Sequence, residues 1–370
     1  MTGSEVGVYV HIPFCERKCA YCAFYSKCSD ASTQKAYTEA LCRNIRAYKG
    51  RGLSCDTLYF GGGTPSVTDA DNIGMILSAV MESFSLPDSA EITIEANPDS
   101  ASCEKLRAYR EMGINRISFG VQSLDDKELK ALGRLHDSEK AVTAVQNALK
   151  AGFENISCDI MIGTPKQTLT SLMRTADRLS ALPISHLSAY LLSVEEGTPF
   201  YKTGVTVNEE VQADMYLRLV ERLNDRGFLQ YEVSNFARDG RASRHNVRYW
   251  QGREYLGFGA SAHSYFEDIR FCCDTDTEGY ISSDKQPRTV LEAHPDKLEE
   301  YIMLGLRLSE GIALDRLSEL GADAEKLGRI KKLAEELAKH GLCTFSGEII
   351  ALTAEGFLTS NEIIAQFELC

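Results

Sequence analysis

Residues 11–22 read His11-Ile12-Pro13-Phe14-Cys15-Glu16-Arg17-Lys18-Cys19-Ala20-Tyr21-Cys22. Their C-x3-C-x2-C spacing is typical of a loop that wraps an iron-sulfur cluster. A cubane cluster has four irons, so Cys15, Cys19 and Cys22 can bind three of them and leave the fourth without a protein ligand. An open metal position is where a metal site does chemistry, as in catalytic zinc sites. We therefore expect a 4Fe–4S cluster at these three cysteines.

Two other uses of closely spaced cysteines fit this stretch less well. A zinc knuckle needs four ligands, and no second pair follows at zinc-finger spacing. A disulfide framework needs an oxidising compartment, whereas residues 1–14 contain neither the basic segment nor the long apolar run of an export signal. We therefore expect reduced thiols and a location in the cytoplasm or another reducing compartment, and of these we predict the cytoplasm.

Outward from this stretch, short β-rich runs alternate with helical patterns such as 138–151, where Ala141, Val145 and Ala148 share one face. Strands that alternate with helices predict βαβ units and a parallel sheet. Six units within about 200 residues predict an α/β fold, a partial (β/α)6 version of the eight-stranded TIM barrel. The six predicted strands are 7–11, 57–60, 91–96, 116–122, 156–162 and 186–192.

Polar residues and glycines stand at the ends of these strands, where barrels of this kind place the active site. The first strand runs into the cysteine loop, and the second ends in Gly61-Gly62-Gly63-Thr64-Pro65. Glu95 and Gln122 lie at the ends of the next two strands, and the fifth strand carries Asp159 before Gly163-Thr164-Pro165. The glycine run is either a plain tight turn or a place where backbone without Cβ approaches a ligand. Next to a cysteine loop, we expect the second.

Composition limits the partners. The chain has 370 residues, 44% apolar and 25% charged, which is ordinary for a globular protein. No apolar run reaches the ~18 residues of a membrane-spanning helix; a peripheral membrane contact stays open. The formal charge of −13, from 40 Lys and Arg against 53 Asp and Glu, counts against a nucleic-acid partner.

Four motifs carry a family resemblance over most of the chain. They are Tyr9-Val10-His11-Ile12-Pro13-Phe14-Cys15, Gly61-Gly62-Gly63-Thr64-Pro65, Phe119-Gly120-Val121-Gln122-Ser123 and Gly163-Thr164-Pro165-Lys166-Gln167-Thr168. These motifs resemble those of the oxygen-independent coproporphyrinogen III oxidase (HemN) group of the radical S-adenosylmethionine (SAM) enzymes. The resemblance implies that SAM binds the fourth iron and that one electron from the cluster cleaves SAM to a 5'-deoxyadenosyl radical.

The same resemblance implies the residues that contact SAM. SAM carries a sulfonium, an ammonium, a carboxylate and a ribose diol, so it needs hydrogen-bond acceptors and one cation. The implied contacts are Tyr9, Gly62, Gly63, Thr64, Glu95, Gln122, Arg134 and Asp159.

One departure from the oxidase pattern narrows the resemblance. The oxidases have the form C-x3-C-x2-C-x-C, but Phe24 stands at the position of the fourth cysteine. The C-x3-C-x2-C-x-F form is similar to the haem chaperone branch of the group, HemW. The run 244–250 also resembles the H-N-x-x-Y-W motif of that branch, where it is implicated in haem handling.

The motif makes His245, Tyr249 and Trp250 candidate haem residues. Imidazole is a good axial ligand of haem iron, and flat rings pack on the macrocycle. The alternative is a structural histidine in an aromatic cluster, and the sequence leaves both open.

We expect three domains: a barrel over 1–205, a barrel-covering α/β extension with the motif over 206–295, and a smaller C-terminal domain over 296–370. Residues 314–368 read helix, helix, hairpin, helix, which resembles a winged helix and raises nucleic-acid binding as an alternative. Residues 296–370 contain 8 Lys and Arg against 14 Asp and Glu, however, so they have no basic footprint.

The sequence therefore predicts a haem chaperone that binds a 4Fe–4S cluster, SAM and haem, and delivers haem to an acceptor protein. The alternative is an enzyme, a coproporphyrinogen III oxidase or another radical SAM oxidoreductase of a tetrapyrrole. Whether the chain is a monomer or a homodimer stays open.

Overall fold

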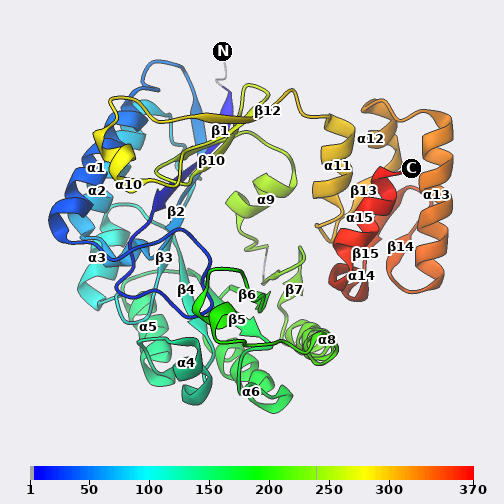
Figure 1. Cartoon of the computed structure of the whole chain (residues 1–370), viewed down its shortest axis with the longest axis horizontal. Coiled ribbons are helices and arrows are strands. Elements are labelled where there is room, and N and C mark those ends of the chain that lie inside the picture. The colour runs from blue at the N-terminus through cyan, green and yellow to red at the C-terminus, as the bar shows by residue number, and fades with distance from the viewer. Residues whose placement is uncertain (1–3, 239) are drawn as a thin grey trace.

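The computed structural model describes residues 4–238 and 240–370, and most of its strands there join one curved twelve-stranded sheet (Figure 1). The six predicted strands form the parallel centre of this sheet in chain order, which confirms the α/β partial barrel. They are β1 (Glu5–Ile12), β2 (Ser54–Gly62), β3 (Glu91–Ala96), β4 (Arg116–Gln122), β5 (Asn155–Ile162) and β6 (His186–Leu191).

Helices connect these strands along the outer side of the sheet (Figure 1). The apolar stripe predicted for 138–151 is buried at Ala141, Val145 and Ala148. Polar caps fix the helix starts; Asp30 Oδ1, for example, accepts from Thr33 N at 2.8 Å. The connecting helices are α1 (Ala31–Arg46), the 3-10 turn η1 (Pro65–Val67), α2 (Ala70–Ser83), α3 (Cys103–Glu111), α4 (Asp126–Leu132), α5 (Ser138–Lys150) and α6 (Leu169–Ser180).

Alternating residues of β1 divide the core from the interior of the barrel. Val8 and Val10 are fully buried in the apolar core, while Tyr9 and His11 line a cavity. Because successive side chains of a strand point to opposite faces, the inner face of the sheet is free to carry chemistry.

The sheet continues beyond the predicted strands at both ends. β9 (Tyr255–Phe258) pairs in parallel with β1, although no crossover helix joins it to a neighbouring strand. Three antiparallel strands follow outward: β10 (His263–Phe266), β11 (Ile269–Cys272) and β12 (Thr289–Ala293). At the other end, β8 (Asn235–Ala237) and β7 (Leu229–Gln230) follow β6. The helices of this region are α7 (Pro199–Lys202), α8 (Glu209–Asp225), α9 (Arg244–Trp250) and α10 (Thr277–Ser282).

The last 74 residues, from Lys297, form helices around a three-stranded antiparallel sheet. The order helix, helix, hairpin, helix is as predicted for 314–368. No helix in the described part of the chain is long and apolar enough to cross a membrane. The elements are α11 (Lys297–Gly305), β13 (Ile312–Ala313), α12 (Leu314–Glu319), α13 (Ala324–Lys339), β14 (Cys343–Phe345), β15 (Ile349–Leu352), α14 (Ala354–Leu358) and α15 (Ser360–Glu368).

Candidate functional site

The cysteine loop follows β1 and is closed by its own backbone. Cys15 N donates to Lys27 O at 3.0 Å, and Lys27 N donates to Pro13 O at 2.8 Å. The loop is also held to the end of α4, where Ala20 N donates to Leu132 O at 3.2 Å. Cys15, Cys19 and Cys22 are free, partly buried thiols on this closed loop.

The glycine run at the end of β2 lies against the cysteine loop. Gly63 N donates to Ile12 O at 2.9 Å, and Thr64 N donates to Phe14 O at 2.8 Å. A Cβ on Gly63 would lie 2.7 Å from Phe14 O, and one on Gly62 would lie 2.6 Å from the His11 ring. Glycine is thus required here because the loop itself comes this close; the predicted contact of the run with SAM stays a prediction.

A chain of hydrogen bonds, here called the polar bridge, joins two of the cysteine sulfurs. Thr64 Oγ1 lies 3.4 Å from Cys15 Sγ and accepts from Asn97 Nδ2 at 3.1 Å. Arg134 Nη2 donates to Asn97 Oδ1 at 2.6 Å. Arg134 Nη1 donates to Cys19 Sγ at 3.4 Å. The bridge residues Thr64, Asn97 and Arg134 follow the C-terminal ends of β2, β3 and α4. They therefore fix the positions of two of the three thiols.

Sequence reasoning did not select Asn97. It directly follows β3, two residues after the selected Glu95. The rule that strand ends carry the site would have found it, but asparagine before proline reads first as a turn.

The environment of the thiols fits an iron-sulfur cluster. Burial raises the pKa of the Cys22 thiol, and the charges of Cys19 and Cys15 raise it further. Bound iron reverses both effects, because a coordinating metal stabilises the thiolate. No three Cys, His, Asp or Glu side chains of the described residues are grouped so as to hold a single ion. A cubane differs, because each cysteine binds a different iron.

Arg134 also fits an anionic group beside the cluster. Its guanidinium binds Cys19 and Asn97, yet its Nε is buried without a partner within the described residues. A buried unpaired donor on a cation is costly. A carboxylate at this position, such as that of SAM, offers the missing acceptor.

Two carboxyl groups lie on the inner face of the barrel. Glu95 accepts from Tyr59 Oη at 2.8 Å and from Gly62 N at 3.2 Å, and burial raises its pKa to about 7. Asp159 accepts from Ser118 Oγ at 3.1 Å, and burial raises its pKa as well. The charge of Asp159 also raises the pKa of Glu95, so the two groups lie near each other. A cationic ligand stabilises both carboxylates, which fits a sulfonium or an ammonium.

Tyr9 and Gln122 complete the set predicted for SAM. The Tyr9 hydroxyl lies 3.0 Å from His11 Nδ1, and burial raises the pKa of Tyr9, which keeps it protonated. Gln122, the last residue of β4, has a φ of 67°, and its Nε2 lies 3.1 Å from the place of a Cβ on Gly120. The predicted residues thus lie on or directly after strands β1 to β5, with Tyr9 and Asp159 in mid-strand, and Arg134 lies just after α4.

Comparison with known families identifies this arrangement. Residues 9–179 match the Radical SAM superfamily, and residues 293–359 match the HemN C-terminal domain. Heme chaperone HemW of Bacillus subtilis is 34% identical over 97% of this chain and 98% of that protein. The chain belongs to the HemN-like group of radical SAM proteins. The resemblance predicted from the motifs is confirmed.

Two more relatives and one solved structure agree with this membership. Heme chaperone HemW of Lactococcus lactis is 32% identical over 98% of this chain and 97% of that protein. The mitochondrial radical S-adenosyl methionine domain-containing protein 1 of Bos taurus is 32% identical over 98% of this chain and 87% of that protein. The structure of coproporphyrinogen III oxidase (HemN) from Escherichia coli superposes with a TM-score of 0.85 over 99% of this chain and 91% of that chain, at 23% sequence identity. That likeness confirms the fold.

In this HemN-like chain, the motif histidine is buried. His245 is fully buried; its Nδ1 lies 2.9 Å from Thr57 Oγ1 and its Nε2 lies 2.7 Å from Tyr249 Oη. Burial lowers the pKa of His245 to about 3. Both ring nitrogens are used within the protein, which is the arrangement of a structural histidine. Trp250 lies apart from this cluster, with the Arg307 guanidinium 5.7 Å from its ring.

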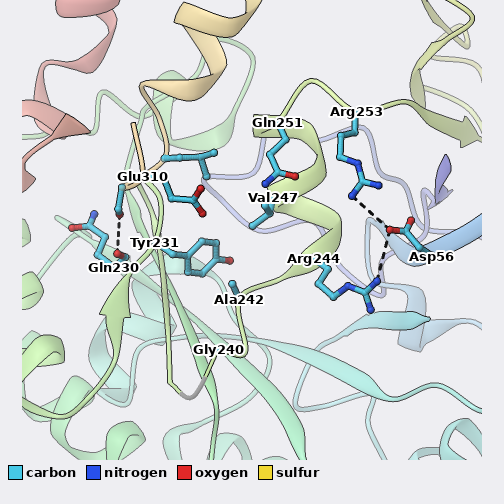
Figure 2. A pocket seen from close by; sticks show the side chains of 12 residues that line it. Asp56, Gln230, Tyr231, Gly240, Ala242, Arg244, Val247, Gln251, Arg253 and Glu310 are labelled. Carbon is cyan, nitrogen blue, oxygen red and sulfur yellow. Dashed lines mark hydrogen bonds and ion pairs between the residues drawn. The ribbon is translucent and has the colours of Figure 1, made fainter. Parts of the chain in front are cut away.

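Helix α9, which carries the motif, separates two cavities. Tyr249 lines a cavity of about 530 Å³ on the side of the cysteine loop, here called the aromatic cavity. Arg244, Val247 and Gln251, at helical spacing, line a second cavity of about 450 Å³ (Figure 2). There Arg244 pairs with Asp56, at 3.7 Å (Figure 2). The helix therefore faces two different spaces, and of its motif residues Tyr249 lines the aromatic cavity, which borders the cysteine loop.

Proposed function

We propose that this chain is a haem chaperone of the radical SAM class. It holds a 4Fe–4S cluster at Cys15, Cys19 and Cys22, binds SAM, and delivers haem to an acceptor protein in the cytoplasm. The full-length similarity to HemW proteins supports this proposal.

The cofactor part of the proposal rests on the polar bridge and the inner carboxyl groups. Arg134 is the cation for the SAM carboxylate, and Glu95 and Asp159 are the acceptors for its cationic and hydroxyl groups. When bound, the reduced cluster supplies one electron to SAM. The chain's own residues position the thiols, neutralise the carboxylate and keep the inner face of the barrel polar.

The observation that favours a chaperone over an oxidase is Phe24. A phenyl ring cannot ligate iron, so the fourth cysteine of the oxidase pattern has no equivalent here. Phe24 is 73% exposed and lines the aromatic cavity. Its ring is therefore accessible to a ligand that enters this cavity. Its flat ring suits a flat macrocycle, so we propose that haem is bound intact.

The first test is the cluster. Anaerobic reconstitution with iron and sulfide is expected to give about one cubane per chain. The triple variant Cys15→Ala, Cys19→Ala, Cys22→Ala is expected to lose it. Cys28→Ala is the matched control, because this exposed thiol follows the same loop and its sulfur hydrogen-bonds to the backbone oxygen of Glu16. A cluster that survives in the triple variant would move the ligands elsewhere.

The second test separates chaperone from enzyme. Reconstituted protein receives coproporphyrinogen III and SAM in one reaction and haem in another. Stable haem binding, transfer to an apo-haemoprotein and no vinyl product are expected. Formation of the vinyl product would refute the chaperone proposal and establish the oxidase alternative.

A further inference from the structure

One face of the sheet forms the floor of the aromatic cavity. In the register of the strands, Tyr9 on β1 pairs with Gly257 on β9, and Tyr255 on β9 pairs with Tyr265 on β10. Because side chains alternate along a strand, Tyr9, Tyr255, Tyr265 and His263 share this face. Gly257 adds no side chain between them. The floor is thus a row of rings with one imidazole.

The opposite side of the cavity comes from three other parts of the chain. Tyr249 of α9 packs edge-on to Tyr255, with ring centroids 4.5 Å apart. Leu304 of α11 and Phe24 of the cysteine loop also line the space. Its volume of about 530 Å³ lies within the ~300–1,000 Å³ of cofactor pockets. The result is a slot lined mainly by aromatic side chains that reaches the cysteine loop.

His263 differs from the other histidines of the chain. It is exposed, lines the slot, and has no side-chain hydrogen bond to any described residue. Each of the other six of the seven histidines has a partner for at least one ring nitrogen. These are His11 with Tyr9, His136 with Val121, His186 with Ser157, His245 with Thr57, His294 with Asp268 and His340 with Glu336.

We propose that the aromatic cavity is the haem site and that His263, not His245, is an axial ligand of the haem iron. The proposal rests on the proposed function as a haem carrier. A neutral imidazole with a free ring nitrogen is the common protein ligand of haem iron. Here it stands on a floor of aromatic rings against which the macrocycle can pack.

One competing ligand lies on the next strand. Cys272 of β11 pairs directly with His263, so both side chains lie on the same face. A thiolate is the other common haem ligand, and it gives a different spectrum. Arg270 lines the cavity too, but its guanidinium already pairs with Glu300. The proposal therefore depends on the imidazole and the rings, and Cys272 is the alternative that the test must separate.

The test is a hemin titration of the reconstituted full chain, followed by the Soret band and electron paramagnetic resonance. In His263→Ala, we expect hemin affinity to fall by about tenfold or more. Removal of a residue that only hydrogen-bonds to a metal ligand already lowers affinity by about tenfold, and removal of the ligand itself should lower it at least as much. The axial-imidazole signal should disappear and return with added imidazole. His263→Met should bind hemin with a shifted spectrum. His340→Ala, which changes an exposed histidine directly after α13, is the matched control and should behave like the wild type.

Each other outcome overturns the assignment. If wild type binds hemin and His263→Ala keeps both affinity and spectrum, the ligand lies elsewhere and the haem-carrier function still stands. A spectrum that changes in Cys272→Ser but not in His263→Ala would assign the ligand to the thiolate. If the wild-type protein binds no hemin, the proposed function and the site are both refuted. Cluster content measured in every variant shows that each one is folded.

Discussion

Asn97→Ala removes the centre of the polar bridge. The substitution deletes a hydrogen bond from the charged Arg134, worth about 1.5–3 kcal/mol, and a neutral one to Thr64, worth about 0.5–1.5 kcal/mol. We therefore expect the free energy of unfolding to fall by about 2–4 kcal/mol. If ~1.4 kcal/mol of this loss weakens the binding of SAM through Arg134 and the cysteine loop, SAM affinity falls about tenfold.

The assay combines urea unfolding with calorimetric SAM titration of the reconstituted protein. Asn361→Ala is the matched control, since Asn361 Oδ1 accepts from Arg307 Nη2 at 2.9 Å on the surface. Its effect should stay within about 0.5 kcal/mol. Asn97→Asp retains the acceptor for Arg134 but loses the donor to Thr64, so it should fall between the two. Equal stability and equal SAM affinity in Asn97→Ala and Asn361→Ala would refute the role of the bridge.

Two further predictions follow from the packing. Gly63→Ala should lower the free energy of unfolding by about 1–3 kcal/mol and reduce cluster yield, because the added Cβ would lie 2.7 Å from Phe14 O. Gly328→Ala is the control: a Cβ there would meet no atom within 4 Å, so neither stability nor cluster yield should fall. Burial raises the pKa of Glu232 from 4.5 to about 7, so stability should fall as pH rises through this window. In urea unfolding experiments, the free energy of unfolding of Glu232→Gln should decrease by about 3 kcal/mol less than that of the wild type over this pH range. Parallel pH profiles for variant and wild type would contradict the prediction.

The central barrel was predictable from two local sequence patterns. Short β-rich runs alternate with helical patterns, and polar residues and glycines follow the strands. Buried parallel strands are continuous apolar runs, and a helix must follow each of them. β9 escaped prediction because it has four residues, among them Gly257, and pairs with β1 through no crossover helix. The pairing is decided by long-range packing, which local patterns do not contain. The domain boundaries at 205 and 295 stay a prediction.

The cysteines and the strand-end residues were predictable for a different reason. Their spacing along the chain is the information that the family motif holds. His263 carries no such spacing signal, and Asn97, although it follows a strand, reads first as a turn residue before proline. The importance of both residues lies in what surrounds them. Asn97 matters because two strand ends and an arginine meet there, and His263 because its strand faces a cavity and leaves its ring unpaired.

The motif histidine shows why loss of function alone does not identify a haem ligand. His245 holds the Tyr249 hydroxyl at 2.7 Å, and Tyr249 forms one wall of the aromatic cavity. Removing the imidazole leaves that hydroxyl unpaired and frees the ring to move, so His245→Ala should weaken haem binding even though, on the proposed assignment to His263, it removes no ligand. The spectrum separates the two roles. A supporting residue changes affinity and leaves the axial-ligand signal intact, whereas loss of a ligand changes both.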